Sequence, residues 1–368
     1  MTRDPIAPRP TRRAPLGLLG MLALVACVEL TISARRLDFT TVWADDWRGA
    51  GRAASRQGLG RDVLCFGDSL VKFGVLPKEI RARTGLKAYN LAVNAGTVPT
   101  SYMLLKRALD AGARPRAIVV DFFALMQPDR PRNSTRMYPD LATTGEVYDL
   151  ARFAGDFEFF NGVMTGKLLP SAKCRFEIRE SVRAALQGRR ASPWPAQAEI
   201  WASWKAQDGA QPMPVPAGRP PADPVLVSDI SPPSWTVDPI NARYAEKFLK
   251  LARAHEIPVF WAMLPLSPEV QALRDRNRTD EAYDRYARGV LARHPEVVVV
   301  DARRSHFDGS AFYDPIHLNV EGARAFTAGL AHELAARLDG HSSAERWVAL
   351  PAQVAGVARV EGQGPASR

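Results

Sequence analysis

Short apolar runs alternate along this chain with longer segments whose apolar residues recur at helical spacing. The runs of strand length are residues 62–66, 88–92, 116–123, 258–264 and 296–300, and the helical segments include residues 101–111, 241–254, 280–293 and 320–338. Strands that alternate with helices in this way form a parallel sheet covered by helices on both faces. The pattern therefore predicts an α/β fold, a three-layer α/β/α sandwich around a central parallel sheet.

The alternation is interrupted between about residues 127 and 235, where Pro, Trp and Gly are concentrated. We interpret this stretch as an insertion into a single domain that spans residues 61–340. Segments 144–153 and 174–187 have helical spacing, and they are expected to cap the sheet or form the rim of a substrate site. The proline-rich residues 211–224 predict an irregular loop.

The first 35 residues have the layout of an export signal. An uncharged apolar run extends from Leu16 to Val28, and four basic residues precede it, namely Arg3, Arg9, Arg12 and Arg13. Such a basic flank stays in the cytoplasm and directs the following chain outward. We expect an uncleaved, single-pass inner-membrane anchor with the domain on the periplasmic side. Residues 36–60 are interpreted as a polar connector and residues 341–368 as a loosely ordered tail.

Two other interpretations of this segment are retained. Residues 24–27 resemble a lipoprotein signal, in which Cys27 is lipidated after cleavage, although the residues that follow Cys27 stay apolar. The segment could instead be a buried helix of a soluble protein, which its basic flank and terminal position disfavour.

The formal charge of +10 raises the question of nucleic-acid binding. It arises from 40 Arg and 9 Lys against 39 acidic residues. The arginines are neither interleaved with stacking aromatic residues nor gathered on one helix, as a nucleic-acid surface requires. We therefore expect no nucleic-acid partner. The three cysteines, Cys27, Cys65 and Cys174, form neither an even disulfide framework nor a zinc-ligand spacing, and Cys65 lies in an apolar run that predicts burial.

Two polar motifs lie at opposite ends of the predicted domain. Gly67, Asp68 and Ser69 follow the first strand, so Ser69 is expected at the carboxyl edge of the sheet, where open parallel sheets bind ligands. Asp314 and His317, three residues apart, precede the last helix. A carboxylate at this spacing can orient the imidazole, which in turn can activate a serine hydroxyl. Taken separately, Ser69 could be a helix cap, Asp314 a turn residue and His317 a polar residue at a helix start.

With these two motifs and the α/β alternation between them, the chain resembles the SGNH hydrolase superfamily, the GDSL-like esterases and lipases. Gly67, Asp68 and Ser69 are similar to its first sequence block, and Asp314 with His317 is similar to its last. The resemblance covers about residues 60–340, apart from the insertion. It implies a flavodoxin-like fold and a catalytic triad of Ser69, His317 and Asp314.

The middle blocks of the family match less closely. Asn94 and Gly96 follow the second strand and are similar to the block whose glycine N–H binds the oxyanion, and we assign both, together with Asp68, to the oxyanion and substrate-binding set. After the third strand the family has Gly-x-Asn-Asp, whose asparagine also donates, whereas this chain has Asp121, Phe122, Phe123 and Ala124. Loss of such a donor costs about 2.7–4 kcal/mol of transition-state stabilisation, and Asn94 is the candidate substitute.

The resemblance implies an exported serine esterase that needs no metal or cofactor. Acylated carbohydrate, for example an O-acetyl ester of a cell-wall polysaccharide or exopolysaccharide, is the expected substrate class. One alternative is an O-acyltransferase that passes the acyl group to a sugar, which the missing asparagine and the anchor favour. Another is a catalytically weak binding or assembly module on the same fold.

The remaining histidines have simpler explanations. His255 and His294 each stand at a helix-to-strand turn, where a donor meets the free carbonyls of a helix end. His306, His332 and His341 are expected at the surface.

Overall fold

The computed structural model describes residues 16–34, 42–123, 131–189, 202–218, 224–341 and 344–351. At its centre lies one sheet of six strands in the order β2-β1-β3-β4-β5-β6, with every neighbouring pair parallel. The strands are β1 (Val63–Phe66), β2 (Ala88–Asn90), β3 (Ala117–Val120), β4 (Val259–Met263), β5 (Val297–Asp301) and β6 (Trp347–Ala349). The parallel α/β architecture predicted from the sequence is confirmed.

Helices cover both faces of this sheet because alternate residues of each strand point to opposite sides. In β1, Leu64 and Phe66 join one apolar core with α2 (Val42–Arg56), α5 (Val98–Asp110), α13 (Pro239–Ala254) and α15 (Thr279–Arg293). Val63 and Cys65 join the other core with α3 (Ser69–Gly74), α4 (Pro77–Thr84) and α16 (Val320–Leu338). The expected burial of Cys65 is confirmed, and burial raises the pKa of its thiol.

Local sequence signals explain where the long helices begin. Thr97 caps α5 in a reciprocal capping box with Thr100, and a proline follows in the first turn. Asp238 accepts hydrogen bonds from the first turn of α13, and Asn319 does the same for α16. The predicted helices 101–111, 241–254, 280–293 and 320–338 are thus found within a few residues of their expected bounds.

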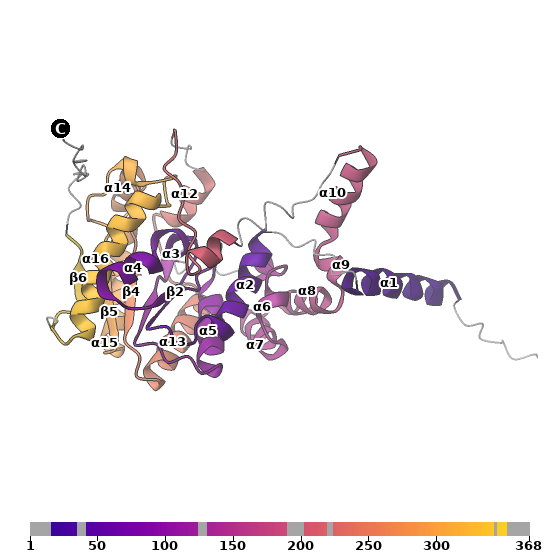
Figure 1. Cartoon of the computed structure of the whole chain (residues 1–368), viewed down its shortest axis with the longest axis horizontal. Coiled ribbons are helices and arrows are strands. Elements are labelled where there is room, and N and C mark those ends of the chain that lie inside the picture. Colours follow the sequence, from indigo (N-terminus) through magenta and orange to yellow (C-terminus); the bar gives the residue numbers. More distant parts are fainter. Residues whose placement is uncertain are drawn as a thin grey trace, which may run out of the picture.

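The insertion contributes α6 (Tyr138–Leu141), α7 (Thr144–Ala154), α8 (Phe157–Leu168), α9 (Pro170–Lys173), α10 (Arg175–Leu186) and α12 (Pro224–Ile230). Figure 1 shows that α6 to α9 lead away from the sheet toward α1 and that α10 extends from α9. The first of these helices extend the core, because Tyr138 packs edge-on against Trp47 on one side and Phe159 on the other, each with ring centroids 5.2 Å apart. In the proline-rich stretch, residues 211–218 form no helix or strand, and residues 219–223 lie outside the described residues.

Two segments differ from the sequence interpretation. The expected polar connector contains α2, which packs against α5 and buries Trp47 completely. Its small residues, such as Gly49, Ala50 and Ala53, allow this close packing, whereas its aspartates and arginines made the segment look polar. Within the expected tail, β6 pairs with β5 at the edge of the sheet. The residues of β6 are only partly buried or exposed, so they lack the apolar run that marks a buried strand.

The helix α1 (Leu16–Ala34) projects from the body and contacts α9. Among its described side chains the apolar ones are exposed, including Leu16, Leu24 and Leu30. Glu29 is buried at the contact with α9, where its carboxylate accepts hydrogen bonds from the Ser171 backbone N–H at 3.2 Å and from the Ser171 hydroxyl.

In the part of the chain that the structure describes, no helix combines the length and apolarity needed to cross a membrane.

A buried ion pair joins α3 to α2. Lys72 Nζ lies 2.8 Å from Asp46 Oδ1, with side chains only 4% and 1% exposed. Replacing Lys72 by methionine is expected to lower the free energy of unfolding by about 3–5 kcal/mol, because the Asp46 carboxylate stays buried without its cation. The matched control is Lys106→Met, whose exposed pair with Asp110 is worth about 0–1 kcal/mol. Equal urea midpoints for the two variants would contradict the expectation.

Candidate functional site

The first part of the site is the turn between β1 and α3. Gly67 has φ of +146°, a conformation that side-chain-bearing residues rarely adopt, and a Cβ there would approach Val71 Cγ2 to 2.7 Å. Asp68 follows as the N-cap of α3, with Oδ1 accepting from the Leu70 N–H at 2.8 Å. Ser69 is therefore the first residue of α3, directly beyond the carboxyl end of β1, and it is partly exposed.

The second part is the loop before α16. Asp314 Oδ1 accepts hydrogen bonds from the backbone N–H groups of Ile316 and His317, each at 2.9 Å. The Tyr313 N–H donates to the His317 carbonyl at 2.8 Å, which closes the loop on itself. These contacts leave Asp314 Oδ2 available to the imidazole, and His317 Nδ1 lies 2.7 Å from this oxygen.

The structure brings the two parts together. His317 Nε2 lies 2.8 Å from Ser69 Oγ, although the residues are 248 positions apart. Ser69, His317 and Asp314 are thus joined by two hydrogen bonds, and the side chains of His317 and Asp314 remain 15% and 24% exposed. Burial by itself would raise the pKa of Asp314, but the hydrogen bond and the charge of His317 hold it below its usual value. Such an arrangement can remove a proton from the serine hydroxyl.

An aromatic side chain that the sequence analysis did not single out orients the imidazole. The Phe73 ring packs edge-on against His317, with centroids 4.9 Å apart. Phe73 stands four residues after Ser69, so one turn of α3 places both beside the same histidine. That helical spacing was the available signal.

The predicted oxyanion donors lie near this turn, but both have partners in the protein. The Gly96 N–H donates to the Val93 carbonyl at 3.0 Å, and a Cβ at Gly96 would come within 2.6 Å of the Gly67 carbonyl oxygen. The Asn94 N–H and side-chain amide both donate to Asp46 Oδ2, at 2.7 and 3.0 Å. Asn94 therefore links the second strand's loop to α2, and its role in binding an oxyanion stays a prediction.

The carboxyl group of Asp121 is buried close enough to Asp68 for the two charges to interact. Asp121 follows β3 and is 5% exposed, with Oδ1 accepting from the Phe123 N–H at 2.8 Å. Within the described residues its Oδ2 has no hydrogen-bond partner. Burial and the neighbouring Asp68 carboxyl raise the pKa of Asp121 well above its usual value. Burial likewise raises the pKa of Asp68 to about 6, against the lowering effects of the Leu70 N–H and His317.

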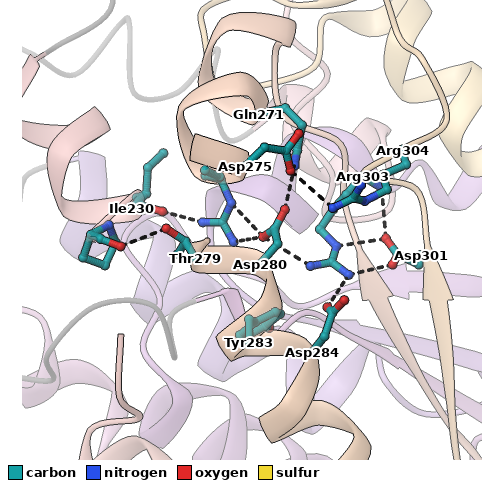
Figure 2. A network of polar contacts seen from close by, with 12 residues as sticks. Ile230, Gln271, Asp275, Thr279, Asp280, Tyr283, Asp284, Asp301, Arg303 and Arg304 are labelled. Carbon is teal, nitrogen blue, oxygen red and sulfur yellow. Dashed lines mark hydrogen bonds and ion pairs between the residues drawn. The ribbon is translucent and has the colours of Figure 1, made fainter. Parts of the chain in front are cut away.

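A buried network of charges supports this end of the sheet (Figure 2). Arg274 of α14 (Pro268–Arg276) donates through Nε to Asp280 Oδ1 at 2.9 Å and also to the Ile230 carbonyl. Arg303 contacts the same carboxylate at 3.2 Å and binds Asp284 and Asp301 at 2.7 and 2.6 Å. The network joins α12, α14, α15 and β5. The residues of this network are scattered in the sequence, so no local sequence motif predicts it.

The other histidines lie where the sequence placed them. His255 ends α13 and is exposed, whereas His294 ends α15 and is buried between Glu296 at 2.9 Å and Glu246 at 3.0 Å. His306, His332 and His341 are exposed. Across the described ranges, no group of three or more His, Cys, Asp or Glu residues is arranged to hold a metal ion.

The raised pKa of Asp68 predicts a pH-dependent stability. Its ordinary pKa is 3.8, so between about pH 4 and 6 folded Asp68 binds a proton that the unfolded chain releases. The free energy of unfolding should therefore fall as the pH rises through this window, by at most about 3 kcal/mol at about 1.4 kcal/mol per pKa unit. Urea denaturation of Asp68→Asn, which keeps a capping oxygen, should show a smaller fall.

The exposed Asp308 supplies the matched control for this measurement, because its pKa is lowered by the Ser310 hydroxyl and backbone N–H. Asp308→Asn should keep the decline in stability between pH 4 and 6. A profile for Asp68→Asn that parallels the wild-type protein would show that Asp68 does not carry the effect.

No family model and no curated protein sequence matches this chain.

Proposed function

We propose that this protein is a serine esterase of the SGNH type, with Ser69 as nucleophile, His317 as general base and acid, and Asp314 as the residue that orients the imidazole. The observation that carries the proposal is the pair of contacts at 2.8 and 2.7 Å that joins the three side chains. The strand order adds support, because β2-β1-β3-β4-β5 is the order of flavodoxin-like folds, and Ser69 follows β1 at the point where the order reverses.

In the proposed reaction Ser69 Oγ attacks the ester carbonyl carbon while its proton passes to His317 Nε2. The carbon–oxygen bond to the alcohol then breaks, and His317 returns the proton to the departing alcohol. Water attacks the acyl-enzyme in the same way, which releases the acid and restores the Ser69 hydroxyl. Asp314 stays ionised throughout and accepts a hydrogen bond from the His317 Nδ1–H, in keeping with its lowered pKa.

The negative charge on the carbonyl oxygen needs hydrogen-bond donors. The proposal assigns the backbone N–H groups of Ser69 and Gly96 to this role. Ser69 is favourably placed at the amino end of α3, while Gly96 lies within van der Waals reach of the Gly67 carbonyl in the same turn. The Gly96 N–H already donates to the Val93 carbonyl. When substrate binds, this N–H therefore has to donate to the oxyanion as well as to Val93, or to the oxyanion in place of Val93.

The proposal places the domain outside the inner membrane, attached through residues 1–35. Four arginines precede α1, and the exposed apolar side chains of α1 provide a surface that water solvates poorly. An acylated carbohydrate of the cell envelope is the substrate class that suits this location. The same triad would serve transfer of the acyl group to a sugar, so the products decide between hydrolysis and transfer.

Covalent labelling tests the proposal directly. A fluorophosphonate probe should label the wild-type protein, and Ser69→Ala should abolish the labelling, because an activated serine alone attacks such a probe. Ser181→Ala, on the outlying helix α10, is the matched control and should label as strongly as wild type. Wild-type protein that reacts no better than Ser69→Ala would support a binding module instead. With an acetylated sugar as donor and a second sugar as acceptor, free acetate identifies an esterase and a newly acetylated sugar identifies a transferase.

A further inference from the structure

Among the described parts of the insertion, the helix α10 extends farthest from the sheet. Figure 1 shows that α10 starts at α9, close to the end of α1 that is nearest the domain. From there it extends at an angle to α1. The contacts agree with this view, because α9 packs against both α1 and α10. The hydrogen bonds from Ser171 to Glu29 join α9 to α1. The position of α10 is thus tied to that of α1.

One side of α10 holds it to the protein. Glu177 and Ala184 are seven residues apart and therefore lie on the same face of the helix. Ala184 is buried, and Glu177 pairs with Arg136, whose Nε also donates to the Lys173 carbonyl at 3.0 Å. These contacts fix which way the helix faces.

The opposite side of α10 combines apolar and basic side chains. Residues 175, 179, 182 and 186 share one face at helical spacing, and residue 183 adjoins them. The five side chains are Arg175, Arg179, Val182, Arg183 and Leu186, all of them exposed, with Val182 at 54% and Leu186 at 84%. Within the described ranges, the guanidinium groups of Arg179 and Arg183 make no hydrogen bond or ion pair with the protein. We call these five residues the basic apolar face.

We propose that the basic apolar face of α10 docks on the anionic phospholipid surface of the membrane that α1 enters, and so sets the orientation of the domain on that surface. The inference rests on the proposed attachment through α1. A helix that lies in the lipid interface inserts apolar side chains below the headgroups while its arginines remain at the level of the phosphates. The basic apolar face supplies both kinds of side chain and no carboxylate.

Two physical features favour a lipid surface as the occupant. Arginine binds phosphate through several donors at once, and the face carries three arginines, Arg175, Arg179 and Arg183, along one helix. The tether removes the entropic cost of bringing α10 to the bilayer, since α9 already holds it beside α1. Weak attraction for each side chain is therefore sufficient for docking.

The test uses the full chain with Cys27→Ser, because Cys65 and Cys174 are buried and Cys27 is the exposed thiol in the described residues. A polarity-sensitive fluorophore is attached at Leu186→Cys, and the protein is reconstituted into phosphatidylcholine vesicles with or without phosphatidylglycerol. The emission should shift to shorter wavelength in the vesicles that contain phosphatidylglycerol, and lipid-borne quenchers should reduce it. A fluorophore at Ser181→Cys, on the side of α10 that carries Glu177 and Ala184, is the matched control and should respond weakly.

Replacing Arg175, Arg179 and Arg183 together by glutamine should reduce the ratio of docked to undocked helix on the order of 100-fold, as expected for three basic side chains at an anionic surface. The corresponding triple lysine variant should retain docking, which separates loss of charge from loss of helix structure. Fluorophosphonate labelling of Ser69 reports independently on the esterase proposal.

The outcomes discriminate between the proposals. Protein that floats with both kinds of vesicle while the Leu186→Cys probe stays unshifted would overturn docking of α10 but leave the attachment through α1. Failure to float with either kind would overturn both. A probe that responds to soluble polyglutamate in neutral detergent, but to neither kind of vesicle, would indicate an acidic polymer as the occupant and would also overturn the lipid proposal.

Discussion

Replacing His317 by alanine should lower kcat for an acetyl ester on the order of 10⁶-fold, as removal of the general base does in serine hydrolases that act through a triad. The imidazole is the group within 2.8 Å of Ser69 Oγ, and a serine hydroxyl at neutral pH is a poor nucleophile without a base. Steady-state hydrolysis of a chromogenic acetyl ester measures the loss. KM should change much less, because His317 acts on the reacting atoms.

A double variant makes this prediction sharper. Ser69→Ala should cost about as much as His317→Ala, and the two changes together should cost no more than either alone, because nucleophile and base act as one unit. The control is His255→Ala, at the exposed end of α13, which should keep wild-type turnover. Losses that multiply in the double variant would show that the two residues work independently and would contradict the proposed triad.

The second large effect is expected for Asp314→Asn, on the order of 10⁴ in kcat. Asparagine can still accept the two backbone hydrogen bonds at Oδ1, so the loop should stay folded. Its amide would instead donate to His317 Nδ1, which holds the imidazole in the tautomer that cannot accept the serine proton. The same acetyl ester assay measures the effect.

The carboxylate of Asp308 provides the comparison for this change. Asp308 caps a short 3₁₀ helix, Gly309–Ala311, in the same region, with Oδ1 accepting from the Ser310 N–H at 2.7 Å. Asp308→Asn should leave turnover within a few-fold of wild type. Asp314→Asn that retains full activity would remove Asp314 from the triad, and equal large losses in the two variants would indicate a general disturbance of the loop.

Much of the framework could be predicted from local patterns. The five predicted apolar runs correspond to β1 to β5. A strand buried on both faces needs a continuous apolar stretch, and such a stretch can be recognised in consecutive residues of the sequence. The position of Ser69 beyond β1 followed in the same way, since a glycine and a capping residue mark the turn. Prediction failed for β6 and α2, because a partly exposed edge strand and a helix that packs through small residues lack a continuous apolar stretch.

The chemical arrangement of the site, in contrast, depends on contacts between distant segments. That Asn94 and Lys72 both bind Asp46, and that Arg274 and Arg303 share Asp280, could not be read from any spacing. The sequence by itself determined which residue types stand at the ends of which elements, because periodicity and caps are properties of neighbours along the chain. Only the tertiary structure decided which of those ends meet, because parallel strand order and helix packing bring residues 248 positions apart to within hydrogen-bonding distance.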